Sequence, residues 1–299
     1  MHLLPRLFTS VFASFFLCLL AGSSHAASLS SVDNISFIFG GGQAGQAFSY
    51  LVDLAGAPNV SPGGNGTVNL VFPGHPNVIT HWSVAGQAAA SFGVLHGSMS
   101  IAGDGNYAAE AGDSSAAVQP AFFDKVTLTV PGLAVGTVLH LAPSFLLSGS
   151  SSNSAAGNLF SEEHSQLTLL VDAVGTQFSA LAAGSYQSQT AAFVNGLPFT
   201  FDATLLLDAH AAPSQAANAL FPALDPFGFA ISHDFANTLK FTGFNVTDLQ
   251  GNAIANYTQS AESGANYLAL VPLPATASLF ASGLFLLAGW FGRHSREHA

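Results

Sequence analysis

Short segments that alternate apolar and polar residues recur along most of this chain, and they restrict its fold more than any other feature. Within residues 125–130, Val126, Leu128 and Val130 fall on one face of an extended segment, which is typical of a half-buried β-strand. Clusters of glycine, proline and asparagine separate such segments, for example at 61–66 and 131–132. The pattern predicts an all-β body, which we expect to be a β-sandwich, with a jelly-roll arrangement as one form.

The same reasoning assigns the individual strands and turns. The expected strands are residues 35–39, 47–54, 66–72, 80–85, 88–95, 125–130, 137–147, 166–173, 175–180, 187–193, 197–209, 237–247 and 253–257. Gly243 is expected to form a β-bulge, and a Gly-Asn turn near 251–252 is expected to close a hairpin. The small residues of 148–161 are expected to form a loop, which either divides two sheets or is one insertion. We favour a single domain over 27–268, with two subdomains as the alternative.

Charged residues are scarce, and their balance excludes one class of function. Only 7% of the residues are charged, against roughly 25% in ordinary globular proteins. Between residues 27 and 270 the basic residues are Lys125 and Lys240, whereas all 16 carboxylates except Glu297 lie there. A duplex nucleic-acid binder needs a basic face, so nucleic acid is not an expected partner. The single cysteine, Cys18, precedes this body, which therefore has no disulfide and no cysteine metal site.

Residues 1–26 have the pattern of a secretory signal peptide, in which a helix carries the chain to the membrane. Arg6 supplies the positive charge, and an apolar segment follows at 7–21. Ser24 and Ala26 are small residues at positions −3 and −1, so we expect cleavage after Ala26. An uncleaved anchor is the alternative. The signal implies that the Sec translocon and signal peptidase act on the chain.

The segment 275–292 is predicted to be a single transmembrane helix. Its 18 residues carry no charge, and a helix of that length measures about 27 Å, close to the roughly 30 Å of a bilayer core. Trp290 would lie at the interface, and Arg293 and Arg296 would remain on the cytoplasmic side. Prolines 272 and 274 prevent the helix from extending back into the body. A buried C-terminal helix is the alternative.

The residues before this segment resemble a known sorting signal. Val271, Pro272, Leu273, Pro274 and Ala275, followed by a short hydrophobic helix and a basic end at 293–299, resemble the PEP-CTERM protein-sorting domain in its VPLPA variant. The resemblance covers residues 271–299, here called the sorting tail, and more weakly the preceding hairpin at 234–254. The family usually ends in a denser arginine cluster, whereas this chain has Glu297 close to its two arginines.

The resemblance implies a route for the protein. Members of the family are exported by Gram-negative bacteria that make extracellular polysaccharide, and a membrane-embedded exosortase, a transpeptidase or protease, cuts them near the proline motif. The tail would then be a temporary anchor, as in proteins that exchange a hydrophobic tail for a lipid anchor. We therefore expect export through the inner membrane, transient anchoring, and release to the cell surface or extracellular matrix.

Few residues of the body indicate a chemical function. Asp104, Asn106, Glu110 and Asp113 form an oxygen-rich stretch that is a weak calcium candidate, with a solvated turn as the favoured interpretation. Trp82 is a weak sugar-stacking candidate, with a place in the core favoured. The chain contains no H-E-x-x-H and no G-x-S-x-G motif, so no catalytic residue is assigned, no metal site is assigned firmly, and calcium is the one cofactor considered.

These observations together predict a non-enzymatic, surface-sorted protein of the bacterial exopolysaccharide or biofilm matrix. Exopolysaccharide itself is a candidate partner. Two alternatives remain open from the sequence. One is a secreted hydrolase that acts on polysaccharide, which would need two facing carboxylates about 5–10 Å apart if it were a glycosidase. The other is a calcium-stabilised sugar-binding module.

Overall fold

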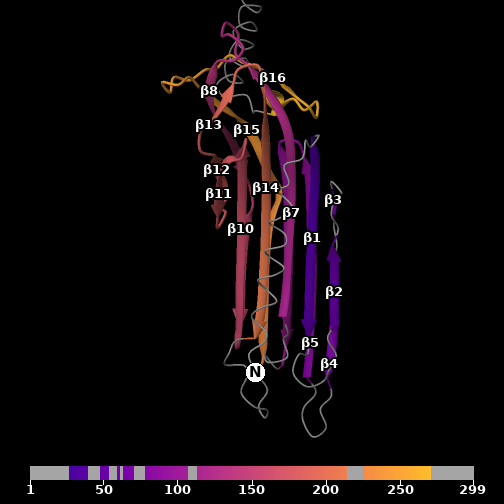
Figure 1. Ribbon diagram of the computed structural model, residues 1–299. Coiled ribbons are helices and arrows are strands. Elements are labelled where there is room, and N and C mark those ends of the chain that lie inside the picture. Colours follow the sequence, from indigo (N-terminus) through magenta and orange to yellow (C-terminus); the bar gives the residue numbers. More distant parts are fainter. Residues whose placement is uncertain are drawn as a thin grey trace, which may run out of the picture.

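The computed structural model describes residues 27–39, 48–53, 59–60, 63–70, 78–106, 113–213 and 225–270. The predictions for the signal peptide (1–26, with Ser24 and Ala26) and for the sorting tail (271–299, with Trp290, Arg293 and Arg296) lie outside these residues. The described chain forms two antiparallel β-sheets that run along the length of the molecule (Figure 1). The prediction of an all-β body made of two sheets is therefore confirmed.

One sheet has seven strands. Its order is β11 (Val174–Ser179), β10 (Leu159–Val171), β14 (Pro198–Pro213), β7 (Asp113–Thr129), β1 (Ser28–Phe39) and β2 (Phe48–Asp53), and β16 (Thr258–Ala261) also pairs with β7. β2 pairs with β1 in antiparallel orientation.

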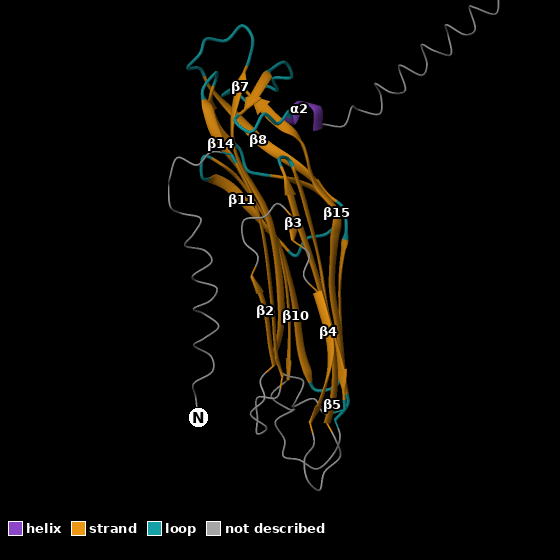
Figure 2. Ribbon diagram, turned by 90° about the vertical axis from the view of Figure 1, so that its right-hand side faces the viewer, coloured by secondary structure: helices purple, strands orange, loops and turns teal. Residues whose placement is uncertain are grey.

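The other sheet has nine strands. Its order is β12 (Gly184–Gln187), β8 (Val138–Leu147), β15 (Phe227–Thr247), β6 (Val94–Gly105), β5 (Val78–Ser91) and β3 (Asn59–Val60), with β13 (Ala191–Val194) on β8, β4 (Gly63–Leu70) on β5 and β9 (Ser150–Ala156) on β15. A short helix, α2 (Tyr267–Leu270), follows β16. Because β7, β10, β14 and β16 each follow a strand of the nine-stranded sheet, the chain crosses repeatedly between the layers (Figure 2).

Alternating inward side chains from both sheets form the core. On β14, Ala203, Leu205 and Leu207 are fully buried, because every second residue of a strand faces the same side. An aromatic cluster occupies the core near the end of β7, and its ring centroids lie 4.8–6.4 Å apart, mostly edge to face. Its members are Phe122, Phe145, Phe201, Phe241, Phe244 and Tyr267.

The structure corrects several of the predicted elements. The expected strand 187–193 divides into the end of β12 and β13, with residues 188–190 outside both. The segment 148–161, expected to be a loop, contains β9 and the start of β10; its serines hydrogen-bond to β15, with Ser152 Oγ 2.8 Å from Ser232 Oγ. The expected strand 88–95 spans the turn between β5 and β6 at 92–93. The expected strand 253–257 is reduced to a single bridge between Thr247 and Ala253. The bulge at Gly243 is confirmed by the shift in register between β15 and β8.

Gly149 makes the sharp step from β8 to β9 possible. Its φ is +145°, and a Cβ atom there would overlap the carbonyl oxygen of Asp234. We expect Gly149→Ala to lower the free energy of unfolding by about 2–4 kcal/mol, because neither the backbone nor the neighbouring strand accommodates the methyl group. Gly132→Ala is the matched control, since Gly132 has φ +85° but open space around it, and should cost about 1 kcal/mol. Urea unfolding that gave equal losses for both variants would contradict this explanation.

Candidate functional site

A shallow depression of about 530 Å³ lies on the outer face of the nine-stranded sheet. Four neighbouring strands, β5, β6, β15 and β9, line it, and register places their residues in two rows across the sheet. The floor is formed where the outward residues are small, at Ala102, Gly228, Ala230 and Ala156. Small side chains leave the backbone of the sheet accessible. The depression therefore exists because alanine and glycine occupy these outward positions.

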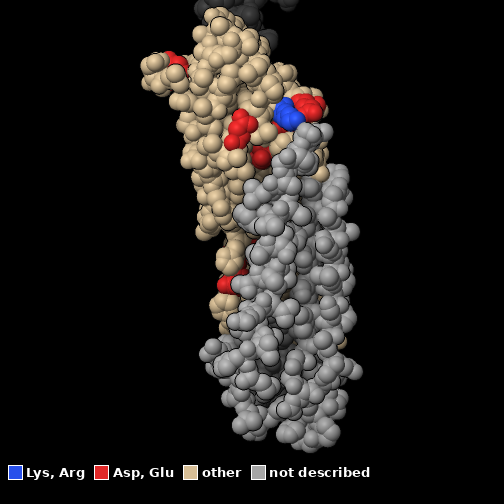
Figure 3. All heavy atoms as spheres, viewed as in Figure 1, with Lys and Arg blue, Asp and Glu red and all other residues tan. Residues whose placement is uncertain are grey.

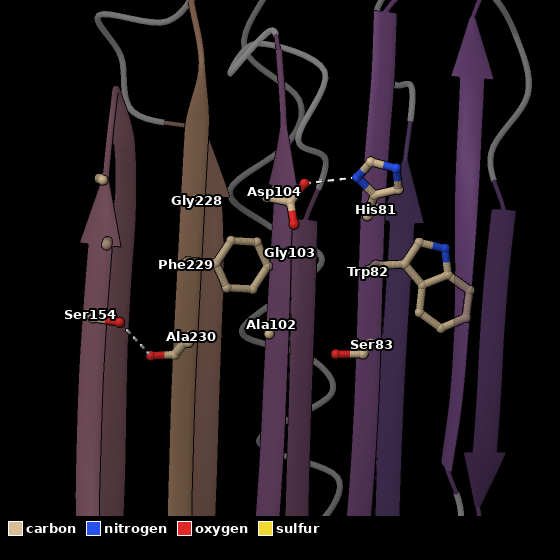
Figure 4. Close-up of a pocket in the computed structure, with 12 residues that line it drawn as sticks. His81, Trp82, Ser83, Ala102, Gly103, Asp104, Ser154, Gly228, Phe229 and Ala230 are labelled. Carbon is tan, nitrogen blue, oxygen red and sulfur yellow. Dashed lines mark hydrogen bonds and ion pairs between the residues drawn. The ribbon is translucent and has the colours of Figure 1, made fainter.

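Two aromatic side chains lie behind this floor rather than on it. The ring of Phe229 extends from β15 over Gly103 of β6, and it occupies the place that a Cβ atom of Gly103 would take (Figure 4). Trp82 is on an inward position of β5 and is 7% exposed. The structure thus places Trp82 in the core, and its indole offers little surface on which a sugar ring could stack.

The rim of the depression carries its polar groups. His81 Nδ1 lies 2.7 Å from Asp104 Oδ1, and both side chains are exposed. The hydroxyl-bearing side chains of Ser83 and Ser154 also line it. Histidine, carboxylate and hydroxyl groups can donate to or accept from a polyol such as a sugar, so the depression is suited to hydrogen bonding of a neutral ligand.

The calcium candidates are only partly brought together. Asp104 Oδ1 is occupied by His81, and Asn106 Oδ1 accepts a hydrogen bond from the backbone N–H of Ile79, 2.9 Å away. Glu110 lies outside the described residues, and the side chain of Asp113, the first residue of β7, is also outside them. Within the described part of the chain, no group of three or more histidine or carboxylate side chains is arranged to hold a metal ion.

A second polar cluster lies on the outer face of the seven-stranded sheet. Register pairs Glu162 with His210 and His164 with Asp208 across β10 and β14, and Glu162 Oε1 lies 3.5 Å from His210 Nδ1. Burial raises the pKa of Asp208 above its ordinary value, while nearby His164 and His210 lower it. Glu163, between them on β10, faces inward, and its Oε2 is buried without a hydrogen-bond partner.

A buried histidine joins the two sheets. His233 is 1% exposed; its Nδ1 lies 2.9 Å from Ser151 Oγ, and its Nε2 lies 3.0 Å from the carbonyl oxygen of Asp208 on the opposite sheet. Because a carbonyl can only accept, Nε2 carries the proton, and Nδ1 accepts from the serine. The pair therefore has the geometry of a clamp between the two sheets.

Burial lowers the pKa of His233, while Glu163 and the carbonyl of Asp208 raise it and His164 lowers it. Below about pH 6.5 the unfolded chain takes up a proton that the folded chain resists, so stability falls until the lower folded pKa is reached. His233→Gln keeps a hydrogen-bond donor toward Asp208 but has no group that titrates in this range. We expect its free energy of unfolding to fall less than that of the wild-type protein between neutral pH and pH 5. An unchanged slope would contradict this role.

A buried carboxylate, which the sequence reasoning missed, fastens the last part of the body. Asp124 is 0% exposed. Its Oδ2 accepts hydrogen bonds from Ser263 Oγ (2.5 Å) and Tyr267 Oη (2.8 Å), and its Oδ1 accepts from the backbone N–H groups of Lys125 and Ser263. The sequence could have indicated this position. Asp124 lies two residues before Val126 and four before Leu128, so it faces the same, inward side of β7.

Burial and the hydrogen bond to Asp124 raise the pKa of Tyr267 above its ordinary value, so the phenol remains a hydrogen-bond donor. We call this set, Asp124, Ser263 and Tyr267, the C-terminal lock. It fastens α2 and the segment between β16 and α2 to β7. The described chain ends three residues after Tyr267, immediately before Val271 of the sorting motif.

No protein-family model and no curated protein matches the chain. Among the residues that the structure describes, no helix is long and apolar enough to span a bilayer.

Proposed function

We propose that the protein is exported, anchored briefly in the membrane by its sorting tail, cut near Val271–Ala275 by an exosortase-like enzyme, and released as a non-catalytic component of the extracellular polysaccharide matrix. In this proposal residues 1–26 form a cleaved signal helix and residues 275–292 form one transmembrane helix. The β-sandwich is the part that remains at the cell surface.

The observation that supports the proposal is the position of the described core relative to the sorting motif. Among the residues that the structure describes, the last member of the buried core is Tyr267, and the VPLPA motif begins at Val271. A cut within the motif would therefore leave the described core and the C-terminal lock whole. A sorting signal that is discarded needs this separation between the folded body and the tail.

The surface of the body supports the matrix role. The outward residues of the nine-stranded sheet include many hydroxyls. These are Ser83, Ser98, Ser100, Ser152, Ser154 and Ser232. A broad face with hydroxyl groups and the His81–Asp104 pair suits many weak hydrogen bonds to a neutral polymer, and we assign exopolysaccharide to it as partner.

The test of the route is a fractionation of the native host. Replacing Pro272 and Pro274 together by alanine is expected to keep the uncut chain in the envelope fraction, because the processing enzyme would no longer recognise the motif. Pro226→Ala, at an exposed proline just before β15, is the matched control and should be sorted normally. Equal release of both variants and the wild-type protein into the medium would refute the sorting role of the motif.

A further inference from the structure

Exposed apolar side chains are concentrated at one end of the sandwich. Leu133 and Val135 of the β7–β8 loop are 41% and 70% exposed, and Leu197 of the β13–β14 turn is 47% exposed. The two connections adjoin, because Gly136 N–H donates to the carbonyl of Asn195, 3.0 Å away. We call Leu133, Val135 and Leu197 the apolar tip.

The tip is rigid because a buried asparagine organises it. Asn195 is 0% exposed; its Oδ1 accepts from Val130 N–H (2.8 Å), and its Nδ2 donates to the carbonyls of Leu133 and Ala134 (both 3.1 Å). These bonds fix the loop backbone and hold the apolar side chains outward instead of letting them collapse onto the sheets. Building a rigid loop to expose leucine and valine is costly for a surface that contacts only water.

The tip also lacks charge. Residues 130–138 and 194–198 contain no acidic or basic side chain, and the top of the described surface in Figure 3 is free of charged groups. An apolar or interfacial environment would therefore require no desolvation of a charge.

The chain leaves the body in the same half of the sandwich. β16 pairs with the last residues of β7, from Val126 to Thr129, which lead directly into the tip loop, and α2 follows (Figures 1 and 2). Four residues separate Leu270 from Ala275, where the uncharged segment 275–292 begins. Such a link spans at most about 18 Å, so an anchored tail would hold this half of the body close to the bilayer.

We propose that the apolar tip docks on the lipid surface of the membrane in which the tail is anchored, and that it orients the body for processing. The inference rests on the anchoring part of the proposed function. Three apolar side chains bind a bilayer weakly on their own, but a short tether raises the effective concentration of the lipid surface for them. The link at 271–274 connects the body to the bilayer and not to a second copy of the chain. The bilayer is therefore the occupant that we assign to the tip.

The test uses the chain from residue 27 onward, which is the form that the proposed signal cleavage leaves and which contains no cysteine, in vesicles of phosphatidylethanolamine and phosphatidylglycerol. Val135→Cys carries an environment-sensitive fluorophore, and lipids with a nitroxide quencher report its depth. Phe160→Cys is the matched control, because Phe160 is also exposed but lies where β10 pairs with the far end of β14, close to Pro213. We expect several-fold stronger quenching at 135 than at 160, and a clear reduction when Leu133→Ser is added.

The outcomes separate this inference from the anchoring on which it rests. If the chain floats with the vesicles but labels at 135 and 160 are quenched equally, the tip does not dock, and the anchor stands. If the chain does not float with the vesicles, the anchor is refuted and tip docking falls with it. A third outcome would also contradict the proposal. If the fluorescence of the label at 135 reports an apolar environment only at high protein concentration, and does so to the same extent in vesicles without the nitroxide lipid, then a second copy of the chain covers the tip.

Discussion

Asp124→Ala is expected to lower the free energy of unfolding by about 3–5 kcal/mol. The carboxylate is fully buried and accepts four hydrogen bonds. Its removal leaves the Tyr267 hydroxyl and two groups of Ser263 without their acceptor inside the protein, and buried donors without partners are costly. Urea unfolding of residues 27–270, followed by Trp82 fluorescence, measures the loss.

A double-mutant cycle tests the lock itself. Tyr267→Phe removes one hydrogen bond and keeps the ring among Phe122, Phe201 and Phe241, so it should cost only about 1–2 kcal/mol. Because the two residues share one bond, the double variant should be less destabilised than the two single losses would give if added. Additive losses would mean that Tyr267 is held by packing alone, and the C-terminal lock would not exist as described.

Asp202→Asn is expected to stabilise the protein by about 1–3 kcal/mol at pH 8 and to change little near pH 4. Burial, and then the nearby Asp172, raise the pKa of Asp202 to about 7. The side chain lies between its cross-strand partners Phe123 and Leu170, and its Oδ1 is buried without a hydrogen-bond partner. Above neutral pH the native state must therefore hold an ionised carboxylate in an apolar setting.

The direction of the pH dependence follows from the sign of this shift. The folded pKa is above the unfolded value, so the contribution of Asp202 to stability is complete at low pH and is lost as the pH rises through about 7. Asp248→Asn is a control of opposite sign, because hydrogen bonds from Asn252 lower the pKa of the exposed Asp248. Unfolding curves at several pH values that showed no gain for Asp202→Asn at pH 8 would contradict the assignment.

Alternation of side chains made much of the fold predictable. Val126, Leu128 and Val130 indicated an inward face of β7, and all three are buried. The bulge at Gly243 was predictable because glycine interrupts an otherwise regular alternation. These features depend on local sequence, and the period of two is a property of any strand.

The errors have a different origin. β9 has almost no apolar residues, and it is a strand because Ser152 and Ser154 can hydrogen-bond to β15, a partner that is remote in sequence. The depression at His81 and Asp104 depends on four strands that come together only in the sheet. His233 and Asp124 could have been suspected, since each is a polar residue at an inward position, but their partners lie on other strands.

The intact mass of the protein, isolated from the envelope and the medium of its native host, tests the central claim most directly. We predict a released form that has lost residues 1–26 and everything beyond the proline motif, with the body through Leu270 retained. A released form that retains Arg293 and Arg296, or a protein found only uncut in the envelope, would contradict the account, because the tail would then be a permanent part of the molecule.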